Sequence, residues 1–263
     1  MTLQFNFEKL ITSANGMLPT SVYIAISEAA ANAKADVLEV GTAHGASAIA
    51  AAKGLSEHLL VKTIDRLQGG SRELYGDIKQ NAAMVNANFI EFGVEDRIQL
   101  FIGSSEEVAP TLKFDNGIGM LILDADGAID RDFRLYYNLL KPGAPIVIDD
   151  YHASSVNVMR SLNGHCVIDQ KHRLTALFID YFEAKGLLIR DKVIKETYFG
   201  VKPENKNVDV TFDLNDFILI YRQLTFGKGK SRPTFILKGL EGLKSAAPKI
   251  YLTLKKIFRP RNL

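Results

Sequence analysis

The sequence predicts an α/β protein built on a doubly wound, mostly parallel sheet. Between about residues 20 and 150, short apolar runs alternate with helix-like stretches, which is typical of parallel strands covered by helices on both faces. An acidic residue or a glycine stands at the end of each expected strand: Glu39, Asp65, Gly103, Asp124 and Asp149. Ligands of such sheets bind outside the carboxyl ends of the strands, so these positions predict one common site.

The individual elements follow from the apolar runs and from the glycine and proline residues between them. Buried strands are expected at residues 36–41, 60–65, 97–103, 119–124 and 144–150. Helices are expected at residues 20–33, 46–53, 73–92, 130–140 and 174–185. Glycine or Pro-Gly follows each of the last four and ends the helix. Later segments are less regular: an antiparallel pair at 187–201, mixed strand and loop signals at 209–224, and a terminal helix at 248–258.

Composition indicates a globular chain of ordinary kind. Its 263 residues are 47% hydrophobic and 24% charged, enough to bury a core. We expect an N-terminal helical lead-in (residues 1–35), a core (36–202) and a C-terminal extension (203–263). The single cysteine excludes an intrachain disulfide and fits a reducing compartment. Because neither a signal peptide nor a spanning apolar segment is visible, we expect a cytoplasmic protein.

Charge is unevenly distributed along the chain. Residues 228–263 contain ten Lys or Arg and one acidic residue, a net charge of +9 in a chain whose total is +2. Such a basic tail is typical of segments that meet an anionic partner, and the inner face of a membrane is the partner we expect. A solvated helix docked on the domain is the alternative. Nucleic acid ranks lower because aromatic residues for base stacking are sparse there.

A glycine-containing motif joins the first expected strand to the next helix. It reads Glu39-x-Gly41-x-x-x-Gly45, in which Gly41 allows a tight turn and Gly45 allows close approach of the backbone to a ligand. A dinucleotide site would have a further glycine at position 43, where this chain has Ala43, which argues against NAD or FAD. Asp65 ends the next strand, where an acid can bind ribose hydroxyls, although a turn or cap role is the alternative.

Four carboxylates follow the fourth and fifth expected strands. They belong to Asp124, Asp126, Asp149 and Asp150, and they converge if these two strands are neighbours. Gathered carboxylates repel each other and resist burial, so the usual reason to collect them is a hard divalent cation with oxygen ligands. The alternative is that these acids serve only as turn and helix-cap residues.

These motifs together resemble the class I S-adenosylmethionine-dependent methyltransferases. Residues 37–45 look like the first motif of that family, residues 63–65 like its second, residues 93–104 like its third strand, and residues 140–143 like the turn before its fifth strand. The resemblance implies a Rossmann-like methyltransferase fold with N-terminal helices, and S-adenosylmethionine as the cofactor. It implies cofactor binding by Glu39, Gly41, Thr42, Gly45, Asp65, Gly103, Ser104, Ser105 and Asp124.

Within that class, the acids resemble those of the metal-dependent macrocin-type and catechol-type O-methyltransferases. The chain reads Asp124-Ala-Asp126 and Asp149-Asp150-Tyr151, which is closer to the macrocin type. The resemblance implies that Mg²⁺ or another divalent cation is held by Asp124, Asp149 and Asp150. Catechol-type enzymes carry a lysine three residues after the first aspartate, where this chain has Gly127, so Asp126 or His152 is left as the catalytic base.

We therefore expect a Mg²⁺-dependent O-methyltransferase that acts on a hydroxyl of a sugar, a glycan or a similar small polyol. A metal-independent methyltransferase of a small molecule is the first alternative, with Asp126 or His152 as base. A non-catalytic membrane- or glycan-associated binding protein on the same fold is the second. A homodimer is the default expectation for the assembly.

Overall fold

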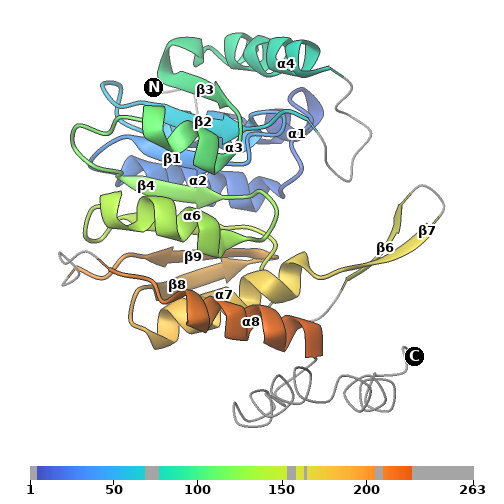
Figure 1. The fold of residues 1–263 in the computed structure, drawn as a ribbon. Helices are drawn as coiled ribbons and strands as arrows, with labels where there is room; N and C mark the ends of the chain where they lie inside the picture. The colour runs from blue at the N-terminus through green and yellow to red at the C-terminus, as the bar shows by residue number, and fades with distance from the viewer. Residues whose placement is uncertain (1–4, 69–76, 153–157, 163–164, 205–209, 227–263) are drawn as a thin grey trace, which may run out of the picture. The chain divides into compact units, whose positions relative to one another are not determined.

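The structure, a computed structural model, describes residues 5–68, 77–152, 158–162, 165–204 and 210–226. Residues 1–214 form one compact unit, and residues 215–263 form a second. The first unit contains a seven-stranded sheet with helices on both faces (Figure 1). This arrangement confirms the predicted doubly wound fold class.

The main sheet consists of five adjacent parallel strands and, beside them, two strands that pair antiparallel with each other. In spatial order they are β3 (Ile98–Ile102), β2 (Val61–Asp65), β1 (Val37–Val40), β4 (Met120–Leu123), β5 (Pro145–Ile148), β9 (Thr197–Val201) and β8 (Ile189–Ile194). The first five run parallel to one another, whereas β9 runs antiparallel to both β5 and β8. The antiparallel pair expected near residues 187–201 is therefore confirmed.

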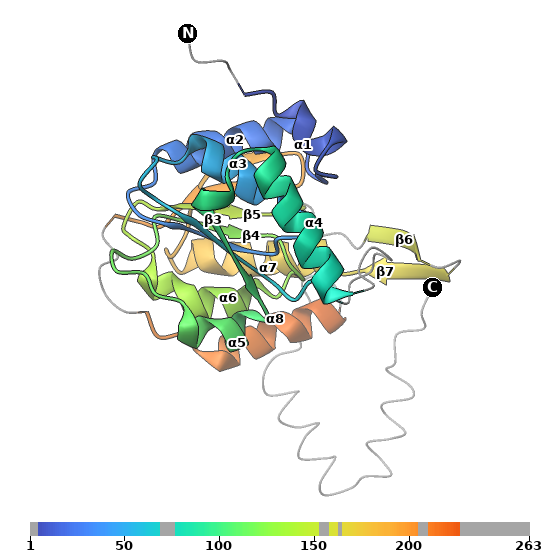
Figure 2. The same cartoon turned by 90° about the horizontal axis from the view of Figure 1, so that it is seen from above.

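The helices form one layer on each face of this sheet (Figure 2). One layer contains α1 (Glu8–Thr12), α2 (Thr20–Ala31), α3 (Ala46–Gly54) and α4 (Ile78–Glu91). The other contains α5 (Ser105–Val108), α6 (Ile129–Tyr136) and α7 (Lys171–Ala184). Short 3-10 turns at Glu95–Arg97, Ala109–Thr111 and Tyr137–Leu139 complete the connections.

The two helical layers pack against the sheet with different side chains. On one side, small residues let α2 and α3 approach closely, and a Cβ on Gly54 would overlap the carbonyl oxygen of Ser27. On the other side, aromatic rings fill the core, with Phe133 and Phe182 stacked at 4.1 Å between centroids. Both layers are apolar because the central strands β1 and β4 are buried along their whole length.

The strand order reverses between β1 and β4, which fixes the place of the site. Val37 pairs with Met120 and Val40 pairs with Leu123, so the two strands end side by side. Their crossovers then leave toward opposite sides of the reversal, which opens the crevice where α/β sheets bind ligands. The residues that follow Val40 and Leu123 are therefore neighbours, although more than 80 positions separate them in the chain.

Two expectations about the elements were wrong, and one element was missed. The segment with mixed signals is a helix, α8 (Leu214–Phe226); its many β-branched and aromatic residues hid an apolar repeat at Phe217, Ile220 and Leu224. A hairpin of β6 (Val158–Leu162) and β7 (His165–Asp169) was not predicted, although Asn-Gly, a typical hairpin turn sequence, stands between the strands. Finally, α4 begins after Asp77, its N-cap, and not at residue 73.

The basic tail and its predicted helix at residues 248–258 lie outside the described residues. Among the residues that are described, none of the helices combines the length and the apolar character needed to cross a membrane. The predicted contact of the tail with an anionic membrane and the homodimer both stay predictions.

Candidate active site

The glycine turn after β1 lies directly against the end of β4. Gly41 has φ +103°, a conformation that glycine adopts readily, and a Cβ there would overlap the carbonyl oxygen of Asp124. Gly45 has φ +86° and is the N-cap of α3, with the ring of Phe89 in the place that its Cβ would take. The two predicted glycines are therefore required by the backbone and by close packing.

A chain of buried hydroxyl groups links this turn to Glu39. The Thr63 hydroxyl donates to Oε2 of Glu39 at 2.5 Å, and the Thr42 and Thr63 hydroxyl oxygens lie 2.6 Å apart. Because Thr63 gives its proton to the carboxylate, Thr42 is the donor in the second bond. Burial raises the pKa of Glu39 to about 7, against the opposing effects of the Ser47 and Thr63 hydroxyl groups. Glu39 is thus a carboxyl group that titrates near neutral pH.

Asp65 joins the first turn to the second strand. Its Oδ2 accepts the backbone N–H of Ala43 at 2.8 Å, and its Oδ1 accepts that of Leu67 at 2.8 Å. Ala43 has φ +47°, in the left-handed region that is uncommon for alanine. The hydrogen bond from Ala43 to Asp65 helps to hold this conformation, so the missing middle glycine of the motif is compensated.

The third strand end also forms a turn. Gly103 has φ +151°, and the Ser104 side chain caps α5 in a reciprocal arrangement with Glu107. Ser105 is buried. The structure thus places the predicted residues 103–105 at the carboxyl end of β3, although it uses the Ser104 hydroxyl for a helix cap.

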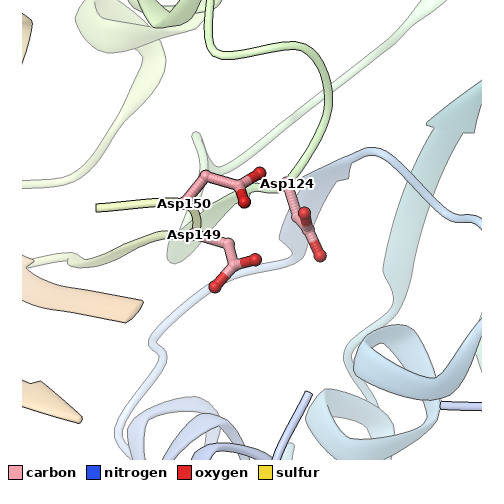
Figure 3. Close-up of side chains that lie close together, drawn as sticks. All are labelled: Asp124, Asp149 and Asp150. Atoms are coloured by element: carbon pink, nitrogen blue, oxygen red, sulfur yellow. The ribbon is translucent and has the colours of Figure 1, made fainter. Parts of the chain in front are cut away.

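Three of the four predicted acids come together. One carboxylate oxygen from each of Asp124, Asp149 and Asp150 lies within 4.8 Å of the others (Figure 3). Adjacent residues of a strand normally point to opposite faces. Asp150 has φ +54°, outside the extended region, and this turn of the backbone lets two consecutive acids face Asp124. The backbone conformation of Asp150 therefore allows the three carboxylates to lie close together.

The cluster is electrostatically unfavourable by itself. Burial, followed by the charge of Asp149, holds the pKa of Asp124 well above its usual range. Burial, followed by the charge of Asp150, raises the pKa of Asp149, although the Thr197 hydroxyl donates to Oδ1 of Asp149 at 2.6 Å. Carboxylates with raised pKa values bind a proton or a cation more readily. The arrangement is therefore suited to cation binding.

Two basic residues at the start of α7 contact the cluster, and the sequence analysis missed both. Lys171 forms an ion pair through Nζ with Oδ2 of Asp150. His172, a buried residue, places Nε2 3.3 Å from Oδ1 of Asp150 and 3.2 Å from Oε2 of Glu196. Burial opposes the charge of Lys171, but Asp124 and Asp150 outweigh it and raise its pKa. Lys171 is thus a protonated ammonium group among carboxylates.

The two predicted base residues lie in different surroundings. Asp126 is absent from the acid cluster and forms an ion pair with Arg131, with 2.9 Å between Oδ2 and Nη1. Burial opposes ionisation of Asp126, but the hydrogen bonds and charge of Arg131 outweigh it and lower the pKa. His152 is half-buried and follows Asp150 by two residues.

Comparison with known proteins agrees with this architecture. Residues 38–151 match a family model described as a methyltransferase domain. The structure is similar to that of an O-methyltransferase from Bacillus cereus in complex with S-adenosylhomocysteine (14% identity, 76% of this chain and 93% of that chain, TM-score 0.56). It is also similar to TomG, an O-methyltransferase from Streptomyces achromogenes involved in tomaymycin synthesis and solved with S-adenosylmethionine (17% identity, 75% of this chain and 87% of that chain, TM-score 0.54).

A third similar structure is the methyltransferase PaMTH1 of Podospora anserina, bound to S-adenosylhomocysteine (17% identity, 76% of this chain and 86% of that chain, TM-score 0.54). At these identities the structures establish the fold. Residues 38–151 therefore resemble a methyltransferase domain, both in the match to the family model and in the fold. The acid cluster and the turn around Gly41 are the features of this chain's own site that bear on its function.

The Asp65→Ala variant is expected to bind S-adenosylhomocysteine about 10- to 100-fold more weakly, the equivalent of losing hydrogen bonds to a charged group. The loss has two sources, because Asp65 is the predicted ribose ligand and also anchors the Ala43 turn. Isothermal titration calorimetry measures the change. Asp77→Ala is the matched control, because Asp77 likewise accepts a backbone N–H two residues ahead, from Lys79. An affinity within twofold of wild type for Asp65→Ala would refute the assignment.

Proposed function

We propose that this protein is a Mg²⁺-dependent O-methyltransferase that transfers the methyl group of S-adenosylmethionine to a hydroxyl of a sugar, a glycan or a similar polyol. The observation that carries the proposal is the contact between the Gly41 turn and the backbone of Asp124. This contact puts the expected cofactor loop beside the carboxylate cluster, so a donor methyl group and a cation-held acceptor would be neighbours. Placing two reactants together supplies much of the rate enhancement in such transfers.

The residues present fit S-adenosylmethionine. Glu39 Oε1 is buried and lacks a hydrogen-bond partner among the described residues, so it can accept a hydrogen bond from a bound molecule. Asp65 has further lone pairs for ribose hydroxyls beyond the two backbone N–H groups that it accepts. The positive charge of the cofactor would also favour the ionised form of Glu39, whose charge is disfavoured by burial.

The residues also fit Mg²⁺. Three carboxylate oxygens close to one another are the hard ligands that this cation prefers. Asp124, Asp149 and Asp150 would hold it, and once bound it would make an acceptor hydroxyl beside it more acidic. The Thr197 hydroxyl donates a hydrogen bond to Asp149 and orients its carboxylate, as residues hydrogen-bonded to metal ligands commonly do.

Methyl transfer breaks a carbon–sulfur bond and forms a carbon–oxygen bond, and the proton of the hydroxyl must move to a base. We propose His152 for this role, since it is half-buried and close in sequence to Asp150. Asp126 is the alternative, but its ion pair with Arg131 lowers its pKa and makes it a weaker proton acceptor. The choice of a sugar-like acceptor rests on the resemblance of Asp149-Asp150-Tyr151 to the macrocin-type sequence.

The Asp149→Asn variant is expected to bind Mg²⁺ more than about tenfold more weakly than wild type while keeping its affinity for S-adenosylhomocysteine. Asp149 is preferred to Asp150 for this test because its loss leaves the ion pair with Lys171 in place. Calorimetric titration of Mg²⁺ into the protein bound to S-adenosylhomocysteine measures the affinity. Asp115→Asn, the same change at an exposed position, is the control.

Methyl transfer to a panel of glycosides and catechols then tests the reaction. Activity that disappears in EDTA and returns with Mg²⁺ supports the proposal. Activity that survives EDTA, or equal Mg²⁺ affinity in Asp149→Asn and wild type, supports the metal-independent reaction instead. Failure to bind S-adenosylhomocysteine would favour a non-catalytic binding protein.

A further inference from the structure

We propose that the Lys171 ammonium group is a built-in counter-cation of the cluster formed by Asp124, Asp149 and Asp150, and that a divalent cation must displace it in order to bind. The inference rests on the proposed metal site, and it adds a competitor that belongs to the chain itself. Lys171 thereby controls the affinity of the cluster for the metal.

The contacts of Asp150 are the first observation. Its Oδ2 is paired with Nζ of Lys171, and its Oδ1 lies 3.3 Å from Nε2 of the buried His172. Both carboxylate oxygens of Asp150 are therefore engaged by groups of α7. A metal ion that takes Asp150 as a ligand would lie close to both partners, and of the two the ammonium group is the one on a flexible stem that can move away.

The position of Lys171 in its helix is the second observation. Lys171 and His172 are the first two residues of α7, and the first turn of this helix contains no acidic residue. The helix dipole favours acids at this end and disfavours cations, so helix stability does not account for the lysine. The carboxylates at the ends of β4 and β5 do account for it, because they supply the opposite charge.

The packing around the lysine stem is the third observation. Gly127 has φ +79°, and a Cβ built there would lie 2.7 Å from Cγ of Lys171. A side chain at position 127 would therefore push the lysine stem out of its present path. The glycine leaves room for Lys171 to reach Asp150 from a helix that begins 44 positions later in the chain.

Electrostatic repulsion prevents the Lys171 ammonium group and a divalent cation from binding the same carboxylates at the same time. An ammonium group paired with Asp150 and a dication on the same carboxylate would repel each other at close range, where the surrounding protein screens less than water. If the ammonium occupies the cluster about nine-tenths of the time, the apparent dissociation constant for the metal is about tenfold higher than in its absence. Removal of the ammonium should therefore tighten metal binding.

The test is a titration of Mn²⁺ into the full chain with S-adenosylhomocysteine present, with unbound Mn²⁺ followed by electron paramagnetic resonance. Lys171→Met is expected to bind Mn²⁺ about tenfold more tightly than wild type, or better. Lys62→Met is the matched control, since Lys62 is also a largely buried lysine in an ion pair, 2.9 Å from Asp36 and away from the cluster. Its Mn²⁺ affinity should equal that of wild type.

The outcomes separate this inference from the proposed function. Binding by Lys171→Met that is equal to wild type or weaker overturns the inference and leaves a metal-dependent enzyme intact. Binding only by Lys171→Met supports the inference and contradicts a metal requirement in the wild-type protein. Absence of Mn²⁺ binding in both proteins overturns both.

A second measurement needs no variant of Lys171 and therefore does not depend on the folding of one. Wild-type protein is acetylated with a water-soluble reagent, with and without saturating Mg²⁺, and lysine modification is read by mass spectrometry. Displacement by the metal is expected to increase the labelling rate of Lys171 several-fold while that of Lys62 stays constant. An unchanged rate at Lys171 under saturating Mg²⁺ overturns the inference.

Discussion

The Gly41→Ala variant is expected to lose about 3–5 kcal/mol of its free energy of unfolding and to lose detectable binding of S-adenosylhomocysteine. About 1–3 kcal/mol comes from forcing alanine to adopt φ +103°, and a similar amount from overpacking. The overpacking is severe because the new Cβ would overlap the carbonyl oxygen of Asp124, which is backbone and cannot rotate away. Chemical denaturation followed by circular dichroism measures the first effect, and calorimetry the second.

Gly93→Ala separates the two contributions. Gly93 also has positive φ, +59°, but a Cβ there would meet nothing within 4 Å. This control should therefore lose only about 1–2 kcal/mol, the amount expected for an alanine in the left-handed region. Equal losses in the two variants would mean that the Gly41 turn can move away from Asp124. The inference that the cofactor loop and the acid cluster are in close, fixed contact would then be contradicted.

The Glu39→Gln variant is expected to be more stable than wild type at pH 8 by about 3 kcal/mol, and equally stable at pH 4. Burial raises the pKa of Glu39 from 4.5 in the unfolded chain to about 7 in the folded protein. Between these pH values the unfolded state releases the proton and the folded state keeps it. The unfolding free energy of wild type therefore falls by about 1.4 kcal/mol per pH unit over this range, whereas glutamine carries no such proton.

The comparison is made on cofactor-free protein by denaturation at several pH values. Glu57→Gln, at an exposed position, controls for the change in net charge. A difference between Glu39→Gln and wild type that does not grow from pH 4 to pH 8 would contradict the raised pKa. The same variant should bind S-adenosylhomocysteine more weakly, because Glu39 is a predicted cofactor ligand, so the position would sacrifice stability for function.

The sheet and the strand-end residues could be predicted because their signals are local. An apolar run of four residues identifies the buried strand β4, and the polar residue that follows it stands at the end of the strand. This reasoning located Asp65, the last residue of β2, and Asp124, which follows β4, whereas Glu39 lies inside β1 as its third residue. Parallel neighbours then bring their carboxyl ends to one edge without any further information.

The remaining features depend on contacts between distant segments. Lys171 and His172 reach Asp150 only because α7 begins beside the end of β5, after the hairpin of β6 and β7. Their one local sign is a pair of basic residues at a helix N-terminus, which opposes the helix dipole. The ion pair of Arg131 with Asp126 is different, because the two residues are only five positions apart in the chain; the sequence analysis did not consider this pair.

The pairing of β5 has a consequence for the chain while it is being synthesised. This strand is parallel to β4 on one side and antiparallel to β9 on the other, and β9 ends at Val201. Until about 50 further residues have left the ribosome, β5 is the outer strand of an incomplete sheet. The backbone groups on its open side are then unpaired, and apolar residues that are buried in the finished fold are exposed. Open edges of this kind attract other chains. Synthesis of the segment that ends with β9 is therefore the step that covers the open edge of β5.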